Sequence, residues 1–176
     1  LNMTIVFVSH DLAEALKLAN NIVIMKDGRI VQHSRPEDIV LKPANDYVRA
    51  FVAHTNPLNV LRGRSLMRPL AACEQRDGET CLDEQADIWL RLDGGGALQD
   101  VRRGTDAWPL QRWSSGDAIE TLEARATLVD ADIGMRDAMH IRYQTGQQLV
   151  LGEGDRPVGI LGDRELYHAL LGKAMG

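Results

Sequence analysis

The sequence predicts an α/β fold for the first part of the chain and an α+β domain of β-α-β-β-α order at its end. Two patterns carry this prediction. A continuous apolar run at residues 4–9 has the length of a strand and leads into a stretch with helical spacing. Residues 126–171 then alternate between strand-like and helix-like segments separated by Gly-containing turns. The composition, with 44% hydrophobic and 26% charged residues, is typical of a globular protein rather than a disordered one.

The first segment predicts a buried strand followed by a helix. The run Thr4-Ile5-Val6-Phe7-Val8-Ser9 is apolar without alternation, which favours a strand covered on both faces, as in a parallel sheet. Asp11 is placed to cap the helix that follows. Apolar residues in that helix recur at a spacing that defines one buried stripe: Leu12, Ala15, Leu16 and Ala19.

The next segment predicts a hairpin and a helix start. Asp27-Gly28 separates the apolar segments 22–25 and 30–31, and this pair favours a tight turn because Gly accepts positive φ. Ser34 and Glu37 have the spacing of a capping box at the start of a short helix.

A change in sequence pattern and charge near residues 55–57 predicts a domain boundary. A further helix is expected at residues 47–53, capped by Asn45 or Asp46. Residues 1–53 carry six acidic and six basic side chains, so the whole net charge of −5 lies beyond them. We therefore place the boundary between His54 and Leu61, with a first domain at 1–55, a linker at 56–63 and a second domain at 64–176.

The pattern is weaker up to about Asp117. Residues 88–92 and 98–101 predict strands around the flexible turn Asp93-Gly94-Gly95-Gly96. Three tryptophans are expected in a small core, with ligand stacking as the alternative: Trp89, Trp108 and Trp113.

The end of the chain has the clearest pattern. A β-α-β-β-α unit of this kind needs a partner face to bury its sheet. Its expected elements are a strand at 126–129, a helix at 132–143, strands at 148–151 and 157–161 around Glu153-Gly154-Asp155, and a helix at 163–171 that ends at Gly172.

The run Thr4-Ile5-Val6-Phe7-Val8-Ser9-His10-Asp11-Leu12-Ala13-Glu14-Ala15 resembles the switch region of ATP-binding cassette (ABC) ATPases. The similarity continues through residues 21–32. The blocks Pro36-Glu37-Asp38-Ile39 and Pro43-Ala44-Asn45-Asp46-Tyr47-Val48 are most similar to the ATPase subunits of glycine betaine, choline and proline importers. An ordered series of motifs over about residues 3–60 is more specific than one short pattern.

This resemblance implies that His10 is the catalytic switch histidine. An imidazole at the end of a strand can donate a hydrogen bond to a γ-phosphate oxygen and sense the loss of that phosphate after hydrolysis. The alternative is that Ser-His-Asp occurs here by coincidence, since the members of a hydrolase triad come from separate segments.

The phosphate-binding pattern G-x-x-x-x-G-K-S/T does not occur in the 176 residues, and Gly94-Gly95-Gly96 lacks its lysine and hydroxyl. The resemblance implies that the Mg²⁺-binding acid, the glutamate base and the family signature lie before Leu1. We therefore expect a C-terminal fragment of a longer subunit. ATP and Mg²⁺ are expected cofactors of that subunit, while the fragment alone is expected to bind neither strongly and to be inactive.

A second similarity lies near the end of the chain. Arg156-Pro157-Val158-Gly159-Ile160-Leu161-Gly162-Asp163-Arg164-Glu165-Leu166 is similar to the end of a cystathionine-β-synthase (CBS) repeat. The resemblance implies that Glu165 occupies the position of a ribose-binding Asp, and that Gly162 replaces a phosphate-binding hydroxyl. We expect a degenerate CBS-like domain that packs and regulates, with an intact nucleotide site as the alternative. The segment 64–113 is a poorer candidate for a first repeat.

The same resemblances imply the partners: membrane permease subunits, a second ATPase subunit in a homodimer and, indirectly, a substrate-binding protein. They place the protein at the cytoplasmic face of the inner membrane, in osmoprotective uptake. The net charge of −5 argues against a nucleic-acid partner. No metal site is expected, because the Asp130, Asp132 and Asp137 group lacks a Gly turn and a closing Glu.

Three functions remain open on the sequence. The chain belongs to the energy-coupling ATPase of a quaternary-amine importer, or its second domain is a ligand-sensing module that gates a transporter. The third is a structural role, in which that domain dimerises two subunits and binds nothing.

Overall fold

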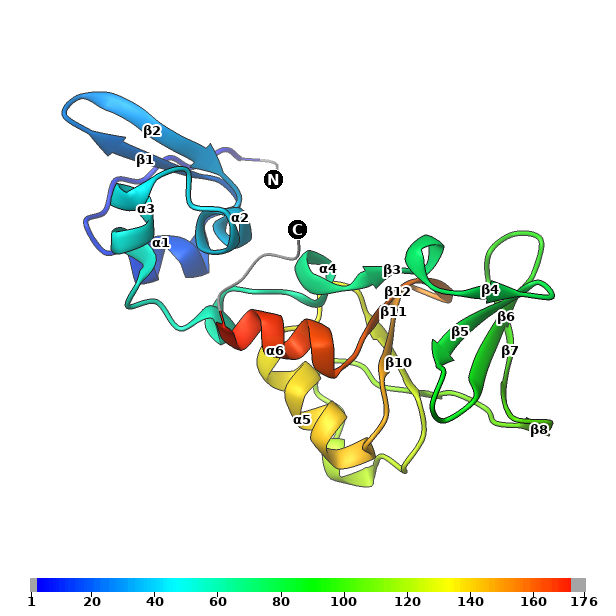
Figure 1. Cartoon of the computed structure of the whole chain (residues 1–176). Helices are drawn as coiled ribbons and strands as arrows, with labels where there is room; N and C mark the ends of the chain where they lie inside the picture. The colour runs from blue at the N-terminus through cyan, green and yellow to red at the C-terminus, as the bar shows by residue number, and fades with distance from the viewer. Residues whose placement is uncertain (1–2, 172–176) are drawn as a thin grey trace. The chain divides into compact units, whose positions relative to one another are not determined.

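The computed structural model describes residues 3–171 (Figure 1). The chain divides into two compact units, Leu1–Val60 and Leu61–Gly176. Val60 packs into the apolar core of the first unit, whereas the Leu61 carbonyl accepts a hydrogen bond from Met135 N in the second. The expected mixture of helices and sheets is confirmed in both units.

The first unit is a two-stranded hairpin packed on short helices. Its apolar core gathers side chains from α1, β1, α2 and α3, with Ile39 and Val48 fully buried. The elements are α1 (Leu12–Leu18), β1 (Ile22–Lys26), β2 (Arg29–Ser34), α2 (Pro36–Leu41), α3 (Asp46–Val52) and the 3₁₀ turn η1 (Pro57–Asn59).

The local signals in this unit are mostly confirmed. Asp11 caps α1 by accepting from Glu14 N at 3.2 Å, and Asn45 caps α3 by accepting from Val48 N at 3.0 Å. Asp27 and Gly28 both have positive φ, 49° and 73°, which is the geometry of the turn expected between β1 and β2.

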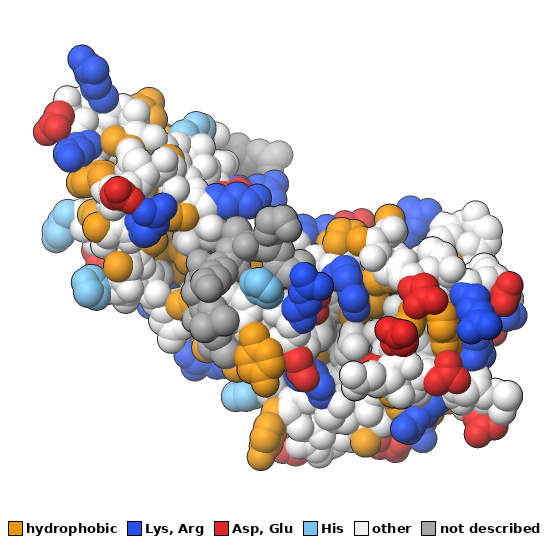
Figure 2. Space-filling model, in the orientation of Figure 1, with side chains coloured by type: hydrophobic (Ala, Val, Ile, Leu, Met, Phe, Trp, Pro, Cys, Tyr) orange, Lys and Arg blue, Asp and Glu red, His pale blue; other side chains and the backbone are white. Residues whose placement is uncertain are grey.

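Two expectations for this unit are wrong. Residues 3–9 form neither helix nor strand, and Val6 and Val8 are 87% and 97% exposed. Apolar side chains also reach the surface of the first unit in the space-filling view (Figure 2). A buried strand exists only through hydrogen bonds to neighbouring strands, and the part of the chain that the structure describes places none beside this run. The capping box also fails, because Ser34 is still the last residue of β2 and Arg35 occupies the N-cap of α2 without a side-chain cap.

The second unit contains the expected β-α-β-β-α order. Parallel β10 and β11 are joined through α5, and β12 pairs antiparallel with β11 before α6. Its five-stranded sheet has the order β3-β12-β11-β10-β9. These elements are α4 (Gly63–Leu66), β3 (Arg68–Pro69), β9 (Gln111–Arg112), η3 (Ile119–Thr121), β10 (Thr127–Asp130), α5 (Met135–Thr145), β11 (Leu149–Glu153), β12 (Arg156–Leu161) and α6 (Asp163–Leu171).

An antiparallel meander replaces any first β-α-β-β-α repeat. Since β3 and β9 are the two edges of one sheet, residues 70–110 form an insertion between them. The insertion folds into a second five-stranded sheet, which we call the meander (Figure 1). Its elements are η2 (Leu70–Ala72), β4 (Gln75–Arg76), β5 (Glu79–Asp83), β6 (Ile88–Leu92), β7 (Leu98–Arg103) and β8 (Asp106–Ala107).

The meander supplies the partner face that the β10–β12 sheet needs. Leu90 and Val101 of the meander belong to the same apolar cluster as Leu128, Val150 and Ile160 of the β10–β12 sheet. Leu90, Val150 and Ile160 are 0% exposed. The main core of this unit therefore lies between the two sheets.

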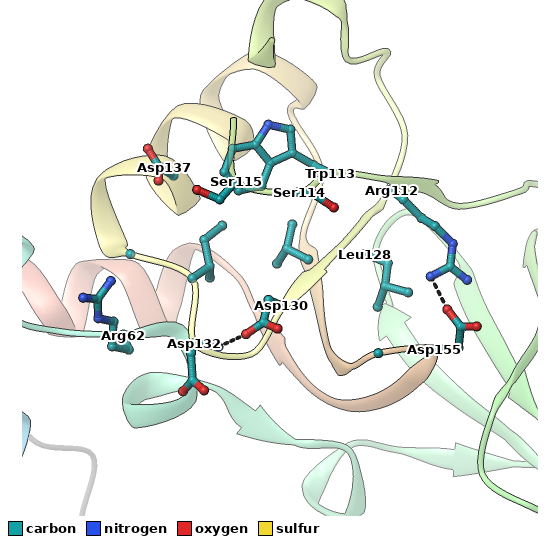
Figure 3. Close-up of a pocket in the computed structure, with 14 residues that line it drawn as sticks. Arg62, Arg112, Trp113, Ser114, Ser115, Leu128, Asp130, Asp132, Asp137 and Asp155 are labelled. Atoms are coloured by element: carbon teal, nitrogen blue, oxygen red, sulfur yellow. Dashed lines mark hydrogen bonds and ion pairs between the residues drawn. The ribbon is translucent and has the colours of Figure 1, made fainter. Parts of the chain in front are cut away.

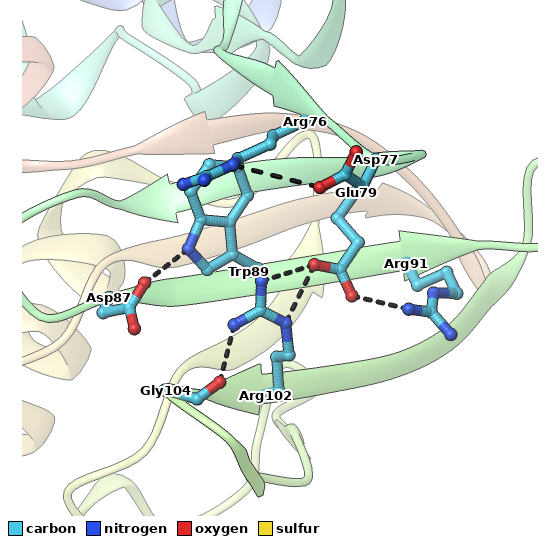
Figure 4. A network of polar contacts seen from close by, with 8 residues as sticks. All are labelled: Arg76, Asp77, Glu79, Asp87, Trp89, Arg91, Arg102 and Gly104. Carbon is cyan, nitrogen blue, oxygen red and sulfur yellow. Dashed lines mark hydrogen bonds and ion pairs between the residues drawn. The ribbon is translucent and has the colours of Figure 1, made fainter.

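A charged network lies on the meander face that carries Trp89 (Figure 4). The Glu79 carboxylate, only 5% exposed, accepts hydrogen bonds from Arg102 and from Arg91 at 2.6–2.8 Å. The Arg102 guanidinium lies 5.6 Å from the Trp89 ring centroid, and Trp89 is 5% exposed. The hydrogen bonds from Arg102, more than those from Arg91, lower the pKa of Glu79 against the opposing effect of burial.

The three tryptophans behave as packing residues. Trp89 and Trp113 are buried, and Trp108 is partly buried against the apolar cluster between the two sheets. Their indole nitrogens are used inside the protein, because Trp89 Nε1 donates to Asp87 at 2.7 Å and Trp113 Nε1 donates to the Asp117 carbonyl at 3.1 Å.

Candidate functional site

The candidate catalytic residue His10 is exposed and directly precedes Asp11, the N-cap residue of α1. Its neighbours hold the loop. Asp11 N donates to Ser9 Oγ at 3.0 Å, and Ser9 Oγ donates to Glu14 Oε2 at 3.1 Å. Among the described residues the His10 imidazole has no hydrogen-bond or ion-pair partner. The local sequence thus fixes the backbone around His10 and leaves its ring available to a partner outside this unit.

Glu165, the candidate ribose-binding residue, lies in the first turn of α6 and is 2% exposed. Its Oε2 accepts a hydrogen bond from Gly162 N at 2.9 Å. Gly162 is the N-cap of α6, because its carbonyl accepts from Leu166 N at 3.1 Å. A Glu at the third helical position that binds the N-cap amide is one half of a capping box. The carboxylate therefore already serves the helix to which it belongs.

The space beside Gly162 is filled by Gln148, the residue before β11. A Cβ at position 162 would lie 3.2 Å from both Cδ and Oε1 of Gln148, and 3.3 Å from Glu165 Oε2. The Gln148 amide is itself held, because its Nε2 donates to Asp83 Oδ2 of the meander at 3.3 Å. Asp83 Oδ1 accepts from Ala86 N at 3.0 Å.

Cys73, the residue after η2, lies near both Arg68 and Glu165. Burial raises the pKa of the Cys73 thiol, and the neighbouring charges of Arg68 and Glu165 act on it in opposite directions. Arg68 Nε and Gln148 Oε1 are buried and have no hydrogen-bond partner within residues 3–171. Sequence reasoning missed Arg68, Asp83 and Gln148. No spacing signal could have found them, because the three come from segments up to eighty residues apart.

A separate open cavity of about 550 Å³ lies at the carboxyl end of β10 (Figure 3). Several of its charged side chains are held by contacts within the second unit. Arg112 Nη1 lies 2.6 Å from Asp155 Oδ1, and Asp130 Oδ1 accepts from Asp132 N at 2.7 Å. Asp132 in turn accepts from Arg64 Nε at 3.0 Å. Asp130 and Asp132 therefore act as loop-fixing groups.

Within residues 3–171 no group of three or more His, Cys, Asp or Glu side chains could hold a metal ion. Nor does this part of the chain contain a helix of the length and apolarity that crossing a bilayer requires. The two cysteines, Cys73 and Cys81, are buried free thiols.

Comparison with known proteins gives consistent relatives, although no family model matches the chain. The chain is 29% identical to a carnitine transport ATP-binding protein of Listeria monocytogenes over 181 residues, which cover 92% of this chain and 43% of the relative. It is 39% identical to a glycine betaine uptake system ATP-binding protein of Escherichia coli, over 74% of this chain and 41% of the relative. It is 56% identical over 52 residues, 30% of this chain and 14% of the relative, to a glycine betaine/carnitine/choline transport ATP-binding protein of Bacillus subtilis. The chain therefore spans about two fifths of the length of the first two of these relatives.

Proposed function

We propose that this chain, which is homologous to the ATP-binding subunits of ABC importers for glycine betaine and carnitine, acts as the C-terminal part of such an energy-coupling subunit. Residues 1–55 would contribute the switch-histidine segment, and residues 64–176 a regulatory or dimerisation domain. The observation that carries the proposal is the ordered match of both units to one relative over 92% of the chain.

His10 is the residue we assign to catalysis. Its ring is exposed, and the backbone on either side is fixed by Ser9, Asp11 and Glu14. An imidazole placed in this way can donate a hydrogen bond to a γ-phosphate oxygen, where charge develops during phosphoryl transfer.

The described residues do not by themselves fit ATP and Mg²⁺. Apart from His10, they include neither a Gly-rich phosphate loop with its lysine nor a carboxylate group suited to a cation. The other contacts to nucleotide and metal would come from the remainder of the longer subunit. That subunit would work with membrane permease components, a second ATPase subunit and a substrate-binding protein, at the cytoplasmic face of the membrane.

The test uses His10→Ala in a longer protein that contains both this chain and a phosphate loop. Because the lost contact is made mainly to the reacting phosphate, steady-state ATP hydrolysis should fall at least about a hundredfold while the Kd for ATP changes less than about threefold. His33→Ala, an exposed imidazole on β2 of the same unit, is the matched control and should leave hydrolysis unchanged. Equal losses in binding and hydrolysis would contradict the assignment. Turnover by the 176-residue chain alone would contradict the division of roles.

A second candidate function, that of a ligand-sensing module, concerns the second unit alone. It is favoured by the β-α-β-β-α order of β10 to α6 and by the position of Glu165 at the start of α6. A ligand that binds only the folded state raises the melting temperature, so thermal shift with ATP, AMP and cyclic dinucleotides tests it. An unchanged melting temperature with all of them at millimolar concentration would leave packing as the role of this unit.

A further inference from the structure

The position where the CBS resemblance expects a phosphate-binding hydroxyl is closed by the protein's own side chains. Gly162 has no side chain, and its vacant Cβ position lies 3.2 Å from Gln148 Oε1 and 3.3 Å from Glu165 Oε2. Contacts below about 3.4 Å are tighter than ordinary van der Waals packing, so a neighbour has to move before any side chain can be added there.

Neither neighbour is free to move. Glu165 is 2% exposed and is bound to Gly162 N at 2.9 Å. Gln148 is bound through Nε2 to Asp83 Oδ2 at 3.3 Å, across 65 positions of sequence. Asp83 ends β5 and is fixed through its second oxygen to Ala86 N. Gln148 thus contacts the meander through Asp83 and the start of α6 beside Gly162.

The amide oxygen of Gln148 indicates which contact determines the orientation of this side chain. Gln148 Oε1 has no hydrogen-bond partner among the described residues, and a buried carbonyl oxygen without a partner is unfavourable. The side chain nevertheless keeps this orientation, because turning the amide over would place its oxygen against the Asp83 carboxylate. The contact with Asp83 therefore determines where the amide lies.

We propose that Asp83 and Gln148 form an internal latch. The hydrogen bond from Gln148 to Asp83 of the meander holds the Gln148 side chain in the space beside Gly162, so that this space is filled without a nucleotide. The meander also buries the sheet face that would otherwise need a second repeat or a second copy. The latch argues against the second candidate function above, since it makes this unit a closed packing module rather than a nucleotide sensor. Its test reports the stability of the second unit, not ATPase activity, so its failure is distinguishable from failure of the His10 assignment.

The decisive experiment is a double-mutant cycle in the 176-residue chain. Gly162→Ala is made in the parent, in Gln148→Ala and in Gln147→Ala, and urea midpoints are compared. The neighbour Gln147 is half-buried and its side chain makes no hydrogen bond to the described part of the chain, so it is the matched control. The unfavourable N-cap propensity of Ala is common to all three backgrounds and cancels.

Gly162→Ala should lower the midpoint in the parent and in Gln147→Ala, and the loss should fall by at least about half in Gln148→Ala. If Gln148→Ala does not fold, Asp83→Asn replaces it. That change keeps the size of the side chain but removes one of two used acceptors, and it should reduce the loss in the same direction. An equal loss in every background would overturn the latch. Binding of AMP or ATP to the parent at micromolar concentration, measured by calorimetry, would also overturn it.

Discussion

The Gly162 amide donates a hydrogen bond to Glu165 Oε2 at 2.9 Å, so the carboxylate expected to face a ribose is turned into the first turn of its own helix. Glu165 is 2% exposed, and the adjacent Cβ position of Gly162 lies within 3.3 Å of the same oxygen. The same contact caps α6 and occupies the carboxylate oxygen that a ligand would need. A ribose could reach Glu165 only after the cap had opened.

We expect Glu165→Ala to destabilise the second unit by about 1–2 kcal/mol, because it leaves the buried Gly162 amide without an acceptor. Glu165→Gln keeps an acceptor oxygen of the same reach and should cost less. Urea unfolding measures both changes. The control is Glu37→Ala in the first unit, because Glu37 forms no such contact with the described residues. Glu153→Ala near the β11–β12 turn is not suitable, because Glu153 accepts a hydrogen bond from Arg64. A ranking in which Glu165→Gln costs as much as Glu165→Ala would exclude the cap as the reason.

The Glu79 network predicts a pH dependence of stability. Its arginine partners lower the pKa of Glu79 below the ordinary value of 4.5. A carboxyl whose folded-state pKa is depressed contributes stability above its unfolded-state pKa and loses this contribution as the pH falls through the folded-state pKa. The stabilisation should therefore be complete at neutral pH and decline below about pH 4.5.

Glu79→Gln removes the titrating group and should make the stability of the second unit less dependent on pH in that acid range. Thermal unfolding at a series of pH values measures the slope. Glu84→Gln is the matched control and should keep the parent slope, because Arg91 and Arg102 hydrogen-bond Glu79 rather than this meander acid. A parent-like slope in Glu79→Gln would show that other carboxyls dominate the acid response.

Short-range signals predicted much of the fold. Asp11 and Asn45 cap the helices they precede, and Asp27-Gly28 forms its turn, because each of these preferences is settled within four residues. The strand expected at residues 4–9 was wrong, because a buried strand depends on neighbouring strands that a local pattern does not reveal.

The meander and the latch also could not be predicted from local patterns, because both depend on contacts between distant parts of the sequence. The strands at 88–92 and 98–101 are expected from the sequence, but no local pattern indicates that residues 70–110 are inserted between the two edges of one sheet. Asp83 and Gln148 are ordinary polar residues in separate segments, and only the paired sheets bring them together. The motif at Gly162 and Glu165 located the candidate site, while its closure depends on tertiary packing.

Backbone conformation at the β11–β12 turn gives a further prediction. Gly154 has φ of +62°, and nothing lies within 4 Å of an added Cβ there. Gly154→Ala should therefore destabilise the second unit by about 1 kcal/mol through backbone strain alone. Gly94→Ala is the matched control, because its added Cβ is equally unobstructed and Gly94 is not among the positive-φ glycines. Equal midpoints for the two variants in urea would show that the turn relaxes without cost.

We expect the second unit to fold independently of the first. The second unit has its own apolar core between two sheets, and its connection to the first runs through Val60 and Leu61. The first unit exposes apolar side chains at residues 3–8, among them Val6 and Val8, and such surface favours aggregation. A chain of residues 61–176 should therefore unfold cooperatively, with a melting temperature close to that of the second unit in the parent, and remain soluble at higher concentration. Loss of the cooperative transition on this truncation would mean that the second unit needs the first in order to fold. Unchanged solubility would mean that the exposed run is not what limits the parent chain. The two readouts are independent, since stability reports the core between the sheets and solubility reports the apolar run.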